Sequence, residues 1–224
     1  MPSVIAFDVN ETLLDLRALD VHFERLFGST AVRGQWFAQM LQLSFVGGLT
    51  GRYVDFSTAQ RAALTMLAQR LGSDVSDAEI DGIVDRMSSL PPHPEVAEAL
   101  AVLRRSSLSV VALTNSVESV AVAQLSNAGI RGYFDRVISA DSVRRLKPAP
   151  EPYRAVAQAF GVDVADVRLV AAHSWDVSGA LAAGCAAAFV ARPGMLLSPI
   201  GPQPDIVGPD IAHVVEQIVA RDAA

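Results

Sequence analysis

Ser3-Val-Ile-Ala-Phe-Asp8-Val9 is the stretch that decides the fold of this 224-residue chain. The apolar run before Asp8 has no polar face, a pattern typical of a strand buried on both sides in a parallel sheet. A carboxylate directly after such a run is costly unless it has a partner. We therefore take Asp8 as the first candidate functional residue.

Similar apolar runs recur along the chain and alternate with helical patterns. Further strands are expected at 108–114, 136–140, 167–172 and 186–191, with helices at 94–105, 117–128, 150–160 and 175–183. Gly129, Gly161 and Gly184 stand just past three of these helices, where a left-handed residue is favoured. This alternation predicts an α/β fold with a doubly wound parallel sheet and right-handed crossovers.

The segment 15–92 interrupts the alternation. Helices alone are expected there, at 15–27, 31–46, 56–71 and 76–89, because apolar residues follow helical spacing. An all-helical block inside an α/β core is best interpreted as an inserted cap. We therefore predict a Rossmann-like core of residues 1–14 and 93–224 and a helical cap of residues 15–92. The Pro- and Gly-rich stretch 192–209 is predicted to be a surface loop before a last helix at 210–221.

Composition narrows the class of partner. Apolar residues make up 51% of the chain, enough for a large core. The formal net charge of −6 argues against nucleic acid and anionic membranes, both of which need a basic surface. Cys185, the only cysteine, is expected to be a small buried hydrophobe. With no signal-peptide or membrane-span pattern, we expect a cytoplasmic protein whose partner is neither nucleic acid nor a membrane.

Polar residues gather where the predicted strands end. In open α/β sheets, ligands bind beyond the carboxyl ends of the strands. The residues expected at that edge are Asp8, Asn10, Thr12, Thr114, Asn115, Ser116, Lys147, Tyr153, His173, Trp175 and Asp176. Each has a structural alternative: Lys147 alone could be a surface lysine, and Asn115 with Glu118 fits a capping box. Their order and spacing together favour a site.

Four ordered motifs carry a family resemblance: Phe7-Asp8-Val-Asn-Glu-Thr12, Leu113-Thr114-Asn115-Ser116, Lys147-Pro148-x4-Tyr153 and His173-Ser-Trp175-Asp176. They resemble the haloacid dehalogenase superfamily over almost the whole chain, including the helical cap. The stretch Arg52-Tyr53-Val-Asp-Phe56 and the Trp175-Asp176 pair are most similar to the type II 2-haloacid dehalogenases. The resemblance implies a hydrolytic dehalogenase of small 2-haloalkanoic acids that needs no cofactor.

The alternative is a Mg²⁺-dependent phosphatase of a small phosphorylated metabolite, in which Asp8 and Asp176 would share the metal. Phosphatases that resemble this chain carry a second aspartate as general acid, and Asn10 stands at that position. They also usually present two acidic residues in the fourth motif, where this chain has Asp176 alone. Both departures favour the dehalogenase. A third alternative, a binding module whose cap hosts a partner, would have little use for Asp8, Lys147 and Asp176 together.

The resemblance also implies roles for the residues. Asp8 would attack the halogen-bearing carbon, forming an ester and expelling halide, while Lys147 keeps Asp8 ionised. Asp176, assisted by His173, would activate the water that cleaves the ester. The residues implied in substrate and halide binding are the backbone N–H groups of Val9 and Asn10, together with Thr114, Asn115, Phe56, Tyr153 and Trp175; Thr12 belongs to the catalytic motif.

Three positions depart from the type II pattern. Phe37 stands where those enzymes carry a halide-binding arginine, so Phe37 would line the substrate site without a charge. Glu11 replaces a glycine. His173 stands within the motif that resembles Ser-x-Asn-x-Trp-Asp in those enzymes, and Ala171 replaces its serine. Our hypothesis is that His173 takes over water positioning. Arg33 and Arg52 are candidates for the missing positive charge. The uncharged face of 34–51, with Trp36, Phe37 and Met40, could serve as a pocket wall or a homodimer contact.

Overall fold

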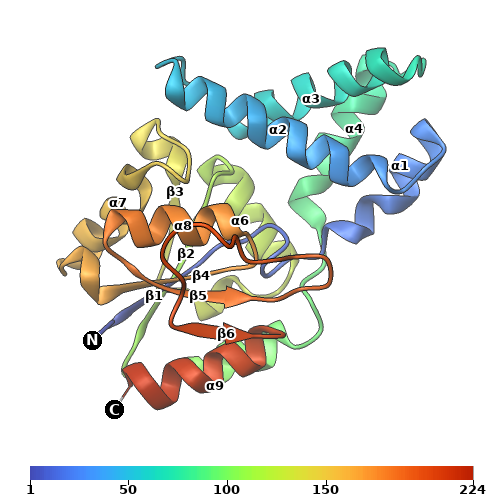
Figure 1. Cartoon of the computed structure of the whole chain (residues 1–224). Helices are drawn as coiled ribbons and strands as arrows, with labels where there is room; N and C mark the ends of the chain where they lie inside the picture. The colour runs from blue at the N-terminus through green and yellow to red at the C-terminus, as the bar shows by residue number, and fades with distance from the viewer. Residues whose placement is uncertain (224) are drawn as a thin grey trace.

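One parallel sheet of six strands forms the centre of the computed structural model, which describes residues 1–223 (Figure 1). The sheet order is β3-β2-β1-β4-β5-β6. The strands are β1 (Val4–Phe7), β2 (Ser109–Thr114), β3 (Arg136–Ser139), β4 (Val167–Ala171), β5 (Ala186–Val190) and β6 (Ile206–Gly208). The five predicted strands are confirmed. β6 corrects the prediction that 192–209 is loop throughout: three residues with Val207 exposed are too short to show an apolar run.

Helices cover both faces of the sheet, as a doubly wound fold requires. Ile5 and Phe7 of β1 belong to one core, and Val4 and Ala6 to the other, and all four are buried. On the Ile5 side lie α5 (Val96–Leu103), α6 (Glu118–Asn127) and α9 (Ile211–Asp222); on the Val4 side lie α7 (Pro150–Phe160) and α8 (Ser174–Ala183). The short 3-10 turns are η3 (Arg131–Tyr133), η4 (Ala140–Val143) and η5 (Val164–Asp166).

A second, all-helical layer stands apart from the sheet between β1 and β2 in the chain (Figure 1). It consists of η1 (Leu16–Leu19), α1 (Asp20–Phe27), α2 (Val32–Leu49), α3 (Phe56–Leu71), α4 (Asp77–Arg86) and η2 (Met87–Ser89). Local capping starts two of these helices: Asp55 accepts from Thr58 N at α3, and Ser76 and Glu79 form a capping box at α4. The helical prediction for this segment is confirmed.

The chain enters and leaves this helical layer through two segments that run side by side. Asp15 N donates to Pro91 O at 2.8 Å, and His93 N donates to Leu13 O at 2.9 Å. We propose that the domain boundaries lie at these crossings, between residues 14 and 15 and between 92 and 93.

Helix α2 packs both within the cap and against the core, where Phe37 stacks on His173 and Phe45 contacts Trp175 edge to face. Trp36 and Met40 are fully buried, and the Trp36 indole donates to Gln60 O on α3 at 3.0 Å. The uncharged face predicted from the sequence is therefore largely interior, while Val46 and Leu49 near the helix end are exposed.

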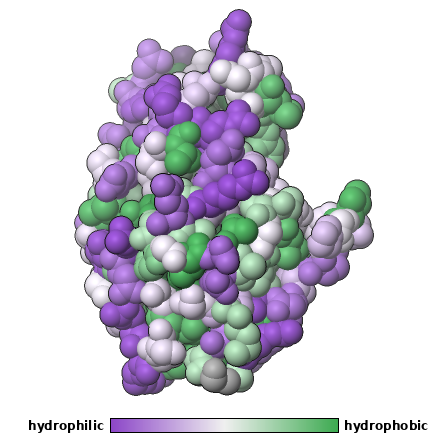
Figure 2. Space-filling view, turned by 90° about the vertical axis from the view of Figure 1, so that its left-hand side faces the viewer, coloured by the Kyte–Doolittle hydropathy of each residue, from purple (hydrophilic) through white to green (hydrophobic). Residues whose placement is uncertain are grey.

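Among the described residues, no helix is long and apolar enough to cross a bilayer. Polar and apolar side chains are interspersed on the face seen in Figure 2.

Candidate functional site

The strand order reverses between β1 and β4, and the predicted polar residues lie at this switch point. β1 is flanked by β2 on one side and by β4 on the other, so crossovers leave in opposite directions and open a crevice at the carboxyl ends. Asp8 follows β1, Asn115 follows β2 and His173 follows β4. The structure brings these side chains together with Lys147 and Asp176.

Asp8 is buried and surrounded by donors. Its Oδ1 accepts from Lys147 Nζ at 2.9 Å, and its Oδ2 accepts from Thr12 Oγ1 at 2.6 Å. His173 Nδ1 lies 3.3 Å from the same Oδ2. Burial alone would raise the pKa of Asp8, but Lys147, His173 and Thr12 outweigh it and hold that pKa well below its usual range. Asp8 is therefore a carboxylate at neutral pH, as a nucleophile must be.

Lys147 links two carboxylates, and the prediction that it could be a surface lysine is wrong because it is 1% exposed. Its Nζ lies 2.5 Å from Asp176 Oδ2 and 3.0 Å from Leu113 O, in addition to Asp8. Burial opposes its charge, but the two carboxylates prevail and raise the pKa of Lys147. It is the only lysine of the chain, a signal that the sequence offered.

Asn115 holds Lys147 in place. Its Oδ1 accepts from Lys147 N at 2.8 Å and its Nδ2 donates to Lys147 O at 3.3 Å. The structural alternative, a capping box of Asn115 with Glu118, is wrong: the N-cap of α6 is Val117, which makes no side-chain cap bond. The amide matches both backbone groups of Lys147, and that long-range pairing takes it away from the helix end.

Asp176 is held from the side opposite Lys147. Tyr153 Oη donates to Asp176 Oδ1 at 2.6 Å, and both side chains are buried. Gly179 permits this approach, because a Cβ there would lie 2.5 Å from Pro148 Cβ and 2.6 Å from Tyr153 Oη. Tyr153 thus fixes the Asp176 carboxylate through the oxygen that does not contact Lys147.

His173 lies between two carboxylates and two aromatic rings. Its Nε2 is 2.9 Å from Glu11 Oε2, opposite the Nδ1 contact with Asp8. The ring stacks on Phe37 at 5.3 Å and on Trp175 at 5.2 Å, with interplanar angles of 14° and 25°. Burial lowers the pKa of His173, but Asp8 and Glu11 raise it to about 9. At neutral pH the ring is a cation, and both of its N–H groups donate.

The raised pKa of His173 makes stability depend on pH. A group whose folded pKa of about 9 exceeds an unfolded value near 6.5 contributes stability that is fully present below pH ~6.5 and is lost as pH rises toward 9. The contribution is roughly 3 kcal/mol. Urea unfolding between pH 6 and 9.5 should therefore show a decline that is absent in His173→Gln. An equal decline in that variant would contradict the assignment.

The remaining predicted residues are distributed as follows. Asn10 Oδ1 accepts from Gln124 Nε2 at 2.9 Å and its Nδ2 reaches Ser116 Oγ at 3.4 Å, so Asn10 is tied to α6. Phe56 is buried in the core at the start of α3. Thr114 Oγ1 accepts from Ser116 N at 3.1 Å, and Val9 is fully buried beside Asp8.

Neither arginine proposed from the sequence stands free beside Phe37. Arg33 Nε lies 2.5 Å from Asp20 Oδ1, and its Nη1 lies 3.3 Å from Glu11 Oε1. Arg52 is exposed. The cation next to the ring of Phe37 is instead His173.

An open hollow of about 290 Å³ lies against His173 and Trp175. Phe37 and Leu41 of α2 supply apolar walls, and Met195 closes part of the rim. Trp175 Nε1 is buried and has no hydrogen-bond partner among the described residues. The hollow therefore has an apolar wall, and His173, which lines it, also contacts the Asp8 carboxylate.

The donor set fits a divalent cation poorly. All four carboxylate oxygens of Asp8 and Asp176 already accept hydrogen bonds from protein groups, and Lys147 Nζ occupies the position between them. The amide of Asn10 is engaged with Gln124. Within residues 1–223, no group of three or more His, Cys, Asp and Glu side chains could hold a metal ion.

Comparisons with known proteins agree with this geometry. The family model for haloacid dehalogenase-like hydrolases matches residues 2–184. Haloacetate dehalogenase H-2 of Moraxella sp. (strain B) is 29% identical over 96% of both chains, and an (S)-2-haloacid dehalogenase of Xanthobacter autotrophicus is 32% identical over 86% of this chain and 76% of its own. A solved L-2-haloacid dehalogenase from Xanthobacter autotrophicus with chloropropionic acid covalently bound has a TM-score of 0.91, with 28% identity and complete coverage of both chains.

Proposed function

This chain belongs to the family of haloacid dehalogenase-like hydrolases, and on that premise we propose that it hydrolyses the carbon–halogen bond of small 2-haloalkanoic acids through an ester on Asp8. The observation that carries the proposal is the buried Asp8 carboxylate, kept ionised by Lys147 and His173. The relatives named above act on haloacids, and one carries a covalently bound acid, which supports the same chemistry here.

The first step is an in-line displacement. An Asp8 oxygen forms a bond to C2 of the acid, the carbon–halogen bond breaks, and halide leaves with the electron pair. The halide needs donors beside an apolar wall: Phe37 lines the hollow, and Trp175 Nε1, which has no partner among the described residues, is our candidate donor. The substrate carboxylate would be held by the backbone after Asp8, at Val9 and Asn10, and by the N-terminal end of α6.

The second step is hydrolysis of the ester by water. Water adds to the Asp8 carboxyl carbon. The bond between that carbon and the oxygen that joins it to the substrate then breaks, and this oxygen leaves as the hydroxyl of the 2-hydroxy acid. Asp176, predicted as the base for this step, has both oxygens engaged by Lys147 and Tyr153. We assign Asp176 to holding Lys147 against Asp8, with Tyr153 and Asn115 supporting that pair.

The phosphatase alternative is not favoured. A Mg²⁺ site would have to displace Lys147 from between Asp8 and Asp176, and Asn10 offers no carboxyl proton for a leaving alcohol. Two further expectations stay predictions. A homodimer would use the exposed end of α2 at Val46 and Leu49. The compartment predicted from the sequence is the cytoplasm.

Halide release from a panel of 2-haloacids, with and without EDTA, tests the proposal. We expect release that EDTA leaves unchanged, because no step requires a metal. A Mg²⁺-dependent phosphatase activity with no halide release from any acid would overturn the proposal and favour the alternative. Intact-mass detection of a transient ester on wild-type enzyme would separate this route from direct attack by water.

A further inference from the structure

We propose that Glu11 is a positioning residue that orients His173, so that His173 acts as the base for ester hydrolysis. His173 becomes able to accept a proton when the ester forms, because Asp8 then loses its negative charge. The inference rests on the proposed ester intermediate. It gives a role to the residue that replaces glycine in the first motif.

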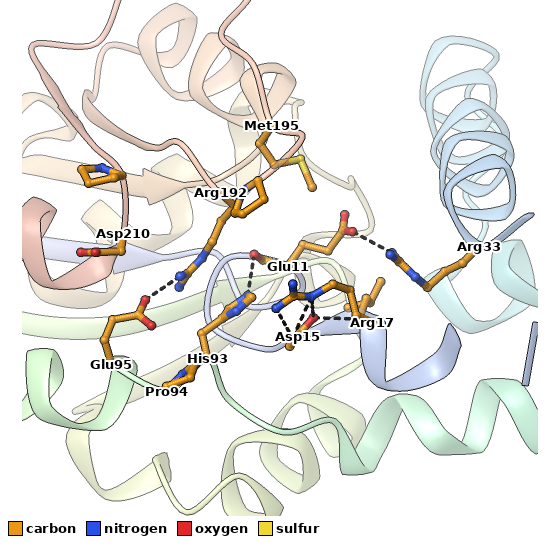
Figure 3. Close-up of a pocket in the computed structure, with 13 residues that line it drawn as sticks. Glu11, Asp15, Arg17, Arg33, His93, Pro94, Glu95, Arg192, Met195 and Asp210 are labelled. Atoms are coloured by element: carbon orange, nitrogen blue, oxygen red, sulfur yellow. Dashed lines mark hydrogen bonds and ion pairs between the residues drawn. The ribbon is translucent and has the colours of Figure 1, made fainter. Parts of the chain in front are cut away.

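Glu11 is placed at some conformational cost. Its φ is 62°, a left-handed conformation that side chains other than glycine rarely adopt. That conformation points the carboxylate at His173, with Oε2 2.9 Å from Nε2. His93 Nε2 approaches Glu11 O at 3.3 Å, and Arg33 of the cap contacts Glu11 Oε1 (Figure 3). Glu11 is therefore held through its backbone carbonyl from the core and through Oε1 from the cap, which leaves Oε2 for His173.

Before the ester forms, His173 cannot accept a proton. Its two ring nitrogens face Asp8 Oδ2 and Glu11 Oε2, and a ring between two carboxylates carries both protons. The ring instead adds positive charge beside Asp8, next to the position where Phe37 replaces the expected arginine. The charged groups around His173, taken from every element packed against it, are Asp8, Glu11, Arg33, Lys147 and Asp176; Phe37 and Trp175 are neutral.

Ester formation removes one of the two carboxylates. The neutral ester no longer stabilises a proton on Nδ1, so that proton is released to solvent, while Glu11 keeps the proton on Nε2. The free Nδ1 lone pair then faces the ester and takes a proton from the attacking water. Glu11 acts as the orienting carboxylate acts in a hydrolytic triad, by fixing the tautomer.

The protons balance over the cycle. Hydroxide adds to the Asp8 carboxyl carbon as His173 Nδ1 gains the water proton. The tetrahedral intermediate then expels the alkoxide, which takes the remaining carboxyl proton and leaves as the 2-hydroxy acid. Asp8 is again a carboxylate and His173 again a cation, so the net products are the hydroxy acid, halide and one proton.

Rapid-quench kinetics with 2-chloropropionate test the role of Glu11. Halide release and ester decay, the latter followed by peptide mass, are measured in wild type, Glu11→Gln and Glu11→Gly. We expect ester decay to slow by about 10²-fold in Glu11→Gly while ester formation changes far less. Glycine adopts the φ of residue 11 freely, so this variant is expected to fold. Glu95→Gln is the matched control, because Glu95 lines the pocket of Figure 3 together with Glu11, a pocket separate from the hollow at Trp175, and its carboxylate contacts Arg192 instead of His173.

The pH profile of ester decay separates positioning from a structural role. Decay should rise with pH as His173 deprotonates in the ester, and Glu11→Gln should move that inflection to lower pH. Unchanged decay and an unmoved inflection in both Glu11 variants would overturn the role of Glu11 and leave the proposed function standing. Failure of the wild type to form any ester would overturn both.

A measurement without turnover completes the test. Asp8→Asn is a neutral stand-in for the ester, so the pKa of His173, about 9 in the free enzyme, should fall in that variant. NMR titration of the imidazole resonances measures it. A His173 ring that stays protonated at pH 8 in Asp8→Asn would contradict the switch.

Discussion

Asp8→Asn should abolish halide release, with a loss of at least about 10⁴-fold, since loss of a covalent nucleophile costs activity on that scale. The amide keeps the shape of the carboxylate and can still accept from Thr12, but it cannot displace halide and be regenerated in the same way. The measurement is halide release over a prolonged incubation, with intact mass to show that residue 8 stays an amide.

The same variant should remain folded. Lys147 keeps its contact with Asp176 and His173 keeps its contact with Glu11, so neither side chain is left without a partner in the interior. Asp15→Asn is a control, because Asp15 pairs with Arg17 away from the reacting atoms. Substantial halide release by Asp8→Asn, without conversion of the amide back to aspartate, would exclude the ester route.

Lys147→Met should destabilise the folded protein strongly. Removing the cation leaves Asp8 and Asp176 facing one another in the interior, and breaking a buried ion pair in this way costs about 3–5 kcal/mol. Activity should fall by at least about 10²-fold, because the positive charge that favours the Asp8 carboxylate is gone. The pKa of Asp8 should rise. As the pH is lowered, the remaining activity should therefore be lost at a higher pH than in the wild type.

Two further variants serve as controls for Lys147→Met. Arg104→Met removes an exposed cation paired with Asp135 and should cost at most about 1 kcal/mol. The double variant Lys147→Met/Asp176→Asn removes one of the two opposed carboxylates, so it should recover part of the stability without recovering activity. Urea unfolding and halide release measure the two properties separately. A Lys147→Met protein as stable as the wild type would mean that the pair contributes little to the fold.

Local patterns in the sequence were sufficient for most of the architecture. The strand before Asp8, the α3 boundaries at Phe56 and Leu71, and the left-handed glycines after α7 and α8 depend on neighbours in the chain. Such signals are visible because burial on both faces and helix capping involve residues close in sequence. β6 escaped prediction because Ile206 finds its partner, Ala188, only across the sheet.

The order of the motifs determined that Asp8, Lys147, His173 and Asp176 would meet at one edge, since strands of a doubly wound sheet end together. Only the tertiary structure decided what each does there. Asn115 pairs with Lys147 rather than capping α6, and Glu11, 162 residues from His173, holds that ring as a cation beside Asp8. Protonation depends on charge and burial within a few ångströms, and these distances between remote segments are set by packing, which no local pattern encodes.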